Sequence, residues 1–577
     1  MSKWMIYTLM SLILFLGVFF RFYGLSEIPP GLYPDEAMNG NNALEAITTG
    51  DFKWFYPENN GREGLFINIQ AISIWIFGNE PWALRAVSAL FGALTILGVY
   101  LLTKELFKKK YPVSSIQYQG SVTSDLNTKY LILNTEVVAL LSSFFLATSY
   151  WHINFSRIGF RAIMVPFFAT FGLYFLLKGL RTAKTTSLIA AGIFIGLGFH
   201  TYIAFRFMPF VIAAPILFSF AKWRREKNQE NFPQTTNYKL QIKSCAPCAI
   251  ALFLFITFIA ALPMGYYFLQ HPEDFVGRGG QVSIFATEQP LYEFAKSNIL
   301  TAQMFFWKGD CNWRHNFNCQ PELHPLVAIF FAVGSILLIK GFFKRPITYN
   351  LEPATLFVWL FFMSLPATLT YEGLPHALRA IGMIPPVMIL AGLGAWRMIA
   401  WILTWLERKK ERWPQNFSQI VRIQLELAIL FPLILLWIPN VAFKDYFFRW
   451  GTHQETYFNF STDIFHLGQY LNGLPPNTLK YVVVNMNGVE VHGIPMPAQT
   501  VMFSTDTFRE GSRLEKNIFY LLPQDISGFQ LPVANNRKVV IALLDGNDRQ
   551  TKQKLEEKFP GMKFKAPGDF VIFTNTE

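Results

Sequence analysis

Two adjacent carboxylates, Asp35 and Glu36, stand in the segment GLYPDEAMNG (31–40), about ten residues after a long apolar run. Charged side chains this close to lipid are costly unless they have a partner or a task. A carboxylate at this depth can act as a base on a hydroxyl group. We therefore predict that Asp35 is a catalytic base and that Glu36 is its companion. Two structural roles compete with this prediction: Asp35 can cap the helix that follows, and Glu36 can be a first-turn acid favoured by the helix dipole.

Basic and polar side chains from other segments are predicted to gather on the same face of the membrane. Guanidinium groups suit a phosphate because their fork pairs with its oxygens bidentately. The expected phosphate- or substrate-binding residues are Arg62, Glu63, Arg157, Arg161, His200, Tyr202, Arg206, His376 and Arg379. For two of them, Arg157 and Arg161, reaching out to lipid headgroups is an equal alternative. His200 and Tyr202 could instead belong to an aromatic belt.

A base and a set of cations beside the bilayer are suited to transfer of a group from a lipid phosphate. If a sugar is linked to a polyprenyl phosphate, its anomeric carbon lies just outside the membrane. The base would deprotonate an acceptor hydroxyl for in-line attack. The departing phosphodiester oxygen is already acidic, so cations that stabilise its negative charge suffice and a general acid is unnecessary.

The external segment GDCNWRHNFNCQPELHP (309–325) carries a second group of reactive side chains. Cys311 and Cys319 are predicted to form a disulfide, since the compartment is oxidising. A metal site that includes His315 is the alternative, although the spacing fits no zinc template. With Asp310 and Arg314, His315 forms a candidate acceptor or loop site. No cofactor is expected, no residue is assigned as a metal ligand, and dependence on a divalent ion is left open. A further pair, Cys245 and Cys248, is interpreted as ordinary small residues.

The composition places these residues in a membrane protein. Of the 577 residues, 52% are hydrophobic and 15% are charged, against roughly 25% charged in a soluble domain. The net charge of +12 does not indicate nucleic-acid binding, because the basic residues cluster in short loops between apolar runs. The first apolar run lacks a small-residue cleavage site and is predicted to stay as a span.

The apolar runs predict a mostly α polytopic protein with about 11 transmembrane helices. They lie near 4–22, 83–103, 133–152, 164–180, 186–203, 207–221, 247–269, 324–343, 354–370, 381–404 and 424–441. The basic segments 104–110, 178–184, 222–227, 340–345 and 407–412 should be cytoplasmic, which puts the N-terminus in the cytoplasm. The chain should therefore lie in the plasma (inner) membrane with an external loop at 23–82.

Two juxtamembrane helices are predicted in that loop. The segment 64–78 is apolar, but at 1.5 Å per residue it reaches only about 22 Å, short of the roughly 30 Å of a hydrocarbon core. It should lie on the outer leaflet, and 37–47 should form a shorter surface helix. Residues 443–577 alternate helical and strand-like pieces, which predicts an extracytoplasmic α/β domain after a transmembrane domain at 1–442.

The chain resembles the multi-span glycosyltransferases of the GT-C class, in the prokaryotic branch of the family 39 protein mannosyltransferases and the aminoarabinose transferases. The resemblance covers roughly 1–400 and rests on YPDEAMNGNNALEAITTGDF, on LFINIQAISIWIFG, on the span that contains Arg85, and on SRIGFRAIMVPF, GLGFHTYIAFRFMP and PHALRAIGMIPP. It implies that Asp35 is the base, with Glu36 at the same motif. It also implies an undecaprenyl- or dolichyl-phosphate sugar donor and an inverting transfer.

Two departures from the family pattern concern the substrates. Aminoarabinose transferases carry Lys-Pro just before the surface helix, where this chain has GREGLF; Arg62 is the expected substitute phosphate ligand. Some relatives have a carboxylate after the third span, near the position of Arg161, where this chain has an arginine. The acceptor is therefore left as a hydroxyl on a protein, a lipid or a surface glycan.

Two other functions compete with this enzyme. A flippase or transporter of lipid-linked sugars usually shows internal repeats and broken midplane helices, and no repeat is evident here. An oligosaccharyltransferase-like ligase would more strongly imply a metal ion for a pyrophosphate donor.

Overall fold

The computed structural model describes residues 2–108, 134–228, 245–344, 351–412, 417–531 and 537–575. Eight helices in this part of the chain are long and apolar enough to cross a membrane. They are α1 (Lys3–Phe22), α4 (Pro81–Leu106), α8 (Met164–Thr182), α10 (Met208–Asn228), α11 (Ala246–Gln270), α14 (Pro325–Lys344), α15 (Leu351–Thr368) and α16 (Ile384–Arg412). The chain is thus a multi-pass membrane protein.

The other three predicted spans differ from these eight. Those at 133–152 and 186–203 correspond to the shorter helices α6 (Thr135–Ala147) and α9 (Thr185–Gly198). The first ends early because the helix stops at Thr148, and the Ser149 hydroxyl caps a new helix, α7 (Tyr150–Arg157). The span at 424–441 lies within α17 (Phe417–Phe443), where several side chains are outside the described residues. Residues 109, 110 and 345 of the basic segments are also outside them.

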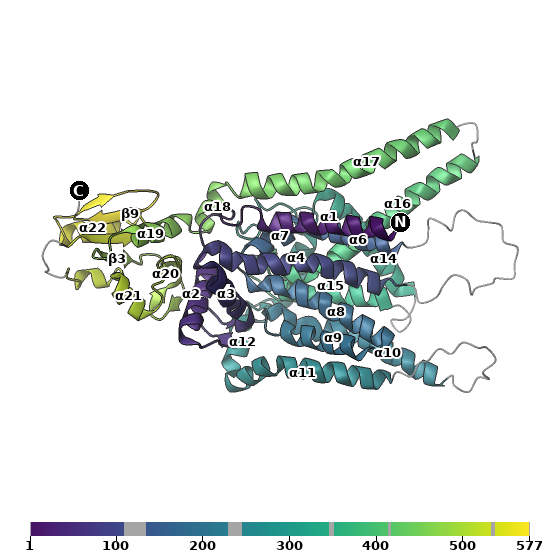
Figure 1. Ribbon diagram of the computed structural model, residues 1–577, viewed down its shortest axis with the longest axis horizontal. Coiled ribbons are helices and arrows are strands. Elements are labelled where there is room, and N and C mark those ends of the chain that lie inside the picture. The colour runs from purple at the N-terminus through teal and green to yellow at the C-terminus, as the bar shows by residue number, and fades with distance from the viewer. Residues whose placement is uncertain are drawn as a thin grey trace.

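The long helices run side by side, and the N-terminus lies at the end of the bundle opposite to α2 (Pro34–Thr49) and α3 (Gly64–Phe77) (Figure 1). Helix α3 has the properties expected of a surface helix. It is only 14 residues long. Phe66 and Ile67 are buried, whereas Trp75 and Ile76 are exposed. Such a helix covers the bundle with one face and leaves an apolar face for the membrane boundary.

Short helices and strands complete the membrane part. The first loop contains an antiparallel pair, β1 (Phe55–Tyr56) and β2 (Arg62–Glu63), that ties the two sides of the turn between α2 and α3 together. After α11 come α12 (Pro272–Gln281) and α13 (Pro290–Gln303). The main hydrophobic core lies between the long helices and includes the fully buried Trp151 and Trp359.

The C-terminal part is a mixed α/β unit. After α17 the chain forms α18 (Gln454–Asn459) and α19 (Thr462–Gly473). The five strands, in the spatial order β6-β3-β7-β9-β8, are β3 (Leu479–Val483), β6 (Ile518–Leu521), β7 (Val539–Leu543), β8 (Lys563–Lys565) and β9 (Val571–Thr574). The strand β3 is parallel to both neighbours, and the pairs of β9 are antiparallel. The remaining elements are β4 (Glu490–Val491), β5 (Ile494–Pro495), α20 (Gln499–Thr505), α21 (Glu510–Lys516) and α22 (Arg549–Lys558).

This unit docks on the membrane part through α20, which packs against α2 (Figure 1). The Asn41 amide donates to the backbone oxygen of Gln499 at 3.1 Å and to its side-chain oxygen at 2.8 Å. Gly40 lets the two helices approach, because a Cβ there would lie 2.3 Å from the Phe503 ring. The C-terminal part therefore contacts α2, the helix whose first turn carries Asp35.

Candidate active site

Asp35 lies in the first turn of α2, directly after Pro34, and is partly exposed. It lines a small cavity of about 60 Å³ together with Asn39 of the same helix and side chains from four other segments: Asn59, Arg62, Phe160, Arg161, Ala162, Tyr202 and Leu378. Of the residues predicted from the sequence, the fold therefore brings Asp35, Arg62, Arg161 and Tyr202 to one place.

Asn59 fixes the orientation of the Asp35 carboxylate. Its side-chain amide donates to Asp35 Oδ1 at 2.7 Å. The turn that carries it is left-handed over three consecutive residues, with φ of 52° at Asn59, 61° at Asn60 and 81° at Gly61. Asn and Gly are the residues that adopt this conformation most readily. The signal in the sequence was the string ENNG, which indicates a turn but not the contact with Asp35.

Arg62 is a buried cation in the wall of this cavity. Its guanidinium donates to the side-chain oxygens of Asn39 at 2.8 Å and Asn42 at 2.5 Å. Burial, with a smaller contribution from the charge of Arg161, lowers the pKa of Arg62 to about 10. The group therefore keeps its positive charge at neutral pH, and its two amide partners are uncharged.

Arg161 is the second cation of the cavity. Its Nε donates to Glu63 Oε2 at 2.6 Å, and its Nη2 donates to the Gly61 oxygen at 3.2 Å. The guanidinium also lies 5.5 Å from the centre of the Tyr202 ring. Glu63 thus acts as a partner that orients Arg161 toward the cavity.

Glu36 has different surroundings from its neighbour in the sequence. It is fully buried, and its two oxygens accept from Arg85 at 3.0 and 3.2 Å. The Gly159 N–H also donates to Oε1 at 2.7 Å. These contacts join α2, α4 and the segment after α7. They give Glu36 a structural role, and its direct part in a reaction stays a prediction.

Five other predicted residues lie outside the lining of this cavity: Arg157, His200, Arg206, Arg379 and His376, which is described with the loop 309–322. Arg157 is buried and donates to the backbone oxygens of Phe20, Gly24 and Ile28, so it closes the end of α1. His200 contacts the Ala260 oxygen at 2.9 Å. Arg206 donates to the Phe275 oxygen, and Arg379 donates to the Glu372 oxygen.

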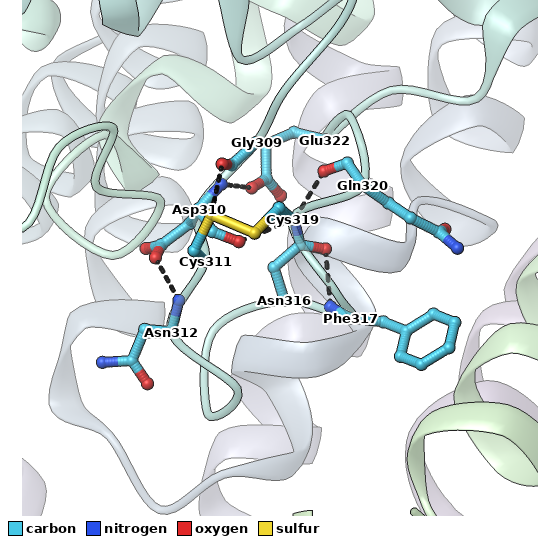
Figure 2. The surroundings of a disulfide bond; sticks show 9 residues. All are labelled: Gly309, Asp310, Cys311, Asn312, Asn316, Phe317, Cys319, Gln320 and Glu322. Carbon is cyan, nitrogen blue, oxygen red and sulfur yellow. Dashed lines mark hydrogen bonds between the residues drawn. A yellow bond between two sulfur atoms is a disulfide. The ribbon is translucent and has the colours of Figure 1, made fainter. Parts of the chain in front are cut away.

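The segment 309–322 forms a compact loop in which the structure joins Cys311 to Cys319 (Figure 2). Asp310 organises one side of it. Its Oδ1 accepts from the Asn312 N–H at 2.8 Å, and its Oδ2 accepts from His315 Nδ1 at 2.8 Å. The same Oδ2 accepts the N–H of Ala377, the residue before Leu378 of the cavity wall. Arg314 lies 4.2 Å from the Tyr33 ring centre, so the loop reaches the residue two before Asp35.

The fold brings together three side chains of kinds that bind metal ions, a set that the spacing of these residues in the sequence did not suggest. Asp310, His315 and His376 each offer one ligand atom, and these atoms lie within 4.8 Å of one another. Two imidazoles and a carboxylate are ligands that zinc accepts, so these residues fit a divalent ion. His376 comes from a loop about 60 residues further along the chain, so no local spacing pattern indicates the cluster. The structure also joins Cys245 to Cys248 in a disulfide, so the interpretation of these two as ordinary small residues is wrong.

Two comparisons with known sequences gave no match: no protein-family model and no curated protein corresponds to this chain. Among solved structures, the chain is similar to ArnT from Cupriavidus metallidurans, in the form bound to undecaprenyl phosphate and in the apo state. Each shows a TM-score of 0.52 and 14% identity over 98% of this chain, and covers 98% and 97% of ArnT.

Two other solved structures are similar at lower scores. The Archaeoglobus fulgidus oligosaccharyltransferase has a TM-score of 0.44 and 13% identity, over 92% of this chain and 68% of its own. The S. cerevisiae protein O-mannosyltransferase Pmt1-Pmt2 complex has a TM-score of 0.31 and 17% identity, over 49% of this chain and 36% of its own. At these scores the two add nothing to the fold assignment. The chain has the GT-C fold that its sequence predicts, in the form seen in ArnT.

Proposed function

We propose that the chain is an inverting glycosyltransferase that moves a sugar from a polyprenyl phosphate to a hydroxyl acceptor. The observation that carries the proposal is the cavity in which the partly exposed Asp35 faces the two cations Arg62 and Arg161. A carboxylate and two guanidinium groups are what this transfer needs: a base for the acceptor and positive charge for the departing phosphate.

In the proposed step, Asp35 takes the proton of the acceptor hydroxyl as its oxygen attacks the anomeric carbon. A new carbon–oxygen bond forms on the face opposite to the phosphate, and the bond from the anomeric carbon to the phosphate oxygen breaks. The electron pair stays on the phosphate, which leaves as the polyprenyl phosphate. Arg161 and Arg62 stabilise the added negative charge, while the Asn59 hydrogen bond keeps the Asp35 carboxylate in place.

Two further observations support the identity of the donor and the location of the cavity. One ArnT structure with this fold holds undecaprenyl phosphate, which supports a polyprenyl-phosphate donor here. We place the cavity on the extracytoplasmic side of the plasma membrane, because the basic segments gather toward the other ends of the spans. The acceptor is a hydroxyl on a protein, a lipid or a surface glycan.

The direct test supplies purified chain with radiolabelled polyprenyl-phosphate sugars and follows the label into a mixture of cell-envelope acceptors. Transfer that needs the intact cavity supports the proposal. Movement of labelled lipid between leaflets without loss of its sugar would support the flippase alternative instead. No release of sugar from any donor of the panel would contradict the proposed reaction.

Replacing Arg161 is expected to weaken donor binding. Arg161→Gln removes a charge-assisted contact with the phosphate, worth about 1.5–3 kcal/mol, and should raise the donor KM about 10- to 100-fold. A matched control is Arg181→Gln, which breaks a similar pair with Glu105 between α4 and α8, far from the cavity. Equal donor KM values for the two variants would remove Arg161 from the donor site.

The proposed step uses no metal ion, so a chelator should leave transfer unchanged within about twofold. The measurement is the initial rate after dialysis against EDTA. A rate that falls on dialysis and returns with Zn²⁺ would contradict this expectation. Loss of that Zn²⁺ response in His376→Ala would then assign the effect to the cluster of Asp310, His315 and His376.

A further inference from the structure

A second and larger cavity lies on the other side of the disulfide-closed loop. Its volume is about 270 Å³, just below the roughly 300 Å³ at which pockets for drug-sized ligands begin. It is formed by the ends of five helices: the end of α6 and start of α7, the start of α14, the first turns of α16, and the end of α17. The cavity is thus placed to receive a group about the size of one sugar ring.

The wall of this cavity changes from apolar to polar. Phe145, Val327, Met388 and Ile438 form the part within the helix bundle, and the polar part comes from the loop and helix ends: Thr148, Ser149, Tyr150, Asn316, Gln320, Glu322, His324 and Asp445. On the outside of α17, Leu433, Leu436 and Trp437 are at least half exposed. The Trp437 ring also packs edge-on against His324, 4.6 Å between centres. The cavity therefore borders an apolar surface that faces lipid.

Three buried polar atoms in this wall have no hydrogen-bond partner in the described part of the chain: Tyr150 Oη, Glu322 Oε2 and His324 Nε2. Buried polar groups are almost always paired, so three in one cavity call for an explanation. Glu322 is only 2% exposed, and its other oxygen accepts from the Asp310 N–H at 3.1 Å (Figure 2). The loop thus fixes the Glu322 side chain through Oε1 and leaves Oε2 without a hydrogen bond in the described residues.

Two of these atoms are able to donate, and the unpaired Glu322 Oε2 is able to accept a hydrogen bond. Burial lowers the pKa of His324, which is therefore neutral. Its Nδ1 accepts from the Leu326 N–H, which leaves the proton on Nε2. The Tyr150 hydroxyl is a donor as well.

The same wall disfavours an anion. The described lining residues include no Lys or Arg but do include Asp445, which is bound to Arg449 at 2.9 Å. A phosphate placed in the cavity would meet the Asp445 carboxylate, and no cation among the described lining residues would pair with it. Hydroxyl groups suit the site better, because they can accept from Tyr150 or His324 and can donate to an oxygen such as Glu322 Oε2.

We infer that this cavity binds the uncharged, hydroxyl-bearing headgroup of a membrane lipid, about one sugar ring in size. The acyl chains would lie on the exposed face of α17 beside Trp437. The inference concerns binding alone and does not depend on the proposed transfer reaction.

The test measures lipid binding to the purified full chain by native mass spectrometry. Three probe lipids with identical acyl chains are glucosyl diacylglycerol, phosphatidylglycerol and diacylglycerol. One glucosyl lipid per chain should bind about tenfold more tightly than either of the others, because only it pairs the buried donors without bringing a charge. Equal binding of the phosphatidylglycerol probe or of the diacylglycerol probe would overturn the assignment of the headgroup.

Tyr150→Phe locates the bound lipid. Its hydroxyl has no hydrogen-bond partner among the described residues, so the variant should fold as the parent does and bind the glucosyl lipid about five- to tenfold more weakly. Tyr457→Phe is the matched control, since that hydroxyl is also buried and unpaired but lies outside the cavity. A second variant, Val441→Trp, should fill the cavity and abolish binding. Unchanged binding in both cavity variants would overturn the inference.

Discussion

Asp35→Asn should lower kcat about 10²- to 10⁴-fold, the usual contribution of a general base, at unchanged donor KM. The substitution keeps the size of the side chain, and the amide oxygen still accepts the hydrogen bond from Asn59. What disappears is the ability to take a proton. The measurement is the rate of sugar transfer at saturating donor, with the thermal stability of the purified variant recorded alongside.

The matched control for this variant is Asp51→Asn, the same change at an exposed position of the same loop, where the carboxylate lies 3.9 Å from the Lys53 ammonium. Its rate should equal that of the parent. The N-cap of α2 is Tyr33 and no side chain among the described residues caps this end, so the capping role considered for Asp35 is wrong. Full turnover by Asp35→Asn would leave Asp35 only the role of a first-turn acid favoured by the helix dipole, and the proposed mechanism would then lose its base.

The second large effect concerns stability. Arg85→Met leaves the Glu36 carboxylate buried without its partner, and removing one member of a buried ion pair costs about 3–5 kcal/mol. The loss is compounded because Arg85 also donates to the backbone oxygens of Pro29 at 2.6 Å and Gly31 at 2.9 Å. We expect a large fall in the temperature at which the purified protein loses its monodisperse state.

Lys296→Met provides the comparison, since it breaks an exposed pair with Glu293 and should change stability by less than about 1 kcal/mol. An Arg85→Met protein that is as stable as the parent but inactive would reverse the interpretation. In that case Arg85 and Glu36 would belong to the reaction, as the sequence predicts for Glu36.

The helices were predictable because each apolar run carries its own signal. The short surface helix α3 was predicted from its length, and a second helix was predicted at 37–47, whereas α2 begins three residues earlier, at Pro34. What periodicity cannot supply is the pairing of distant residues. Arg157 looked like a phosphate ligand, yet its guanidinium binds the backbone oxygens at the end of α1, 129 to 137 positions away.

The same limit applies within the site. Arg62 and Arg161 could be proposed from their chemistry, but Asn59 could not, because its contact depends on three consecutive left-handed residues. Likewise Glu322 and His324 are ordinary polar residues in the sequence. Only the packing of α7, α14 and α17 encloses them and leaves their free atoms in one cavity.

The docking of α20 on α2 has a consequence for how the protein matures. The helix that bears Asp35 is made within the first tenth of translation, whereas its contacts from Gln499 and Phe503 are made near the end. A nascent chain already anchored in the bilayer therefore holds α2 without the contacts that α20 supplies. Under the proposed function, we expect sugar transfer only from chains in which α20 has been made and has docked on α2.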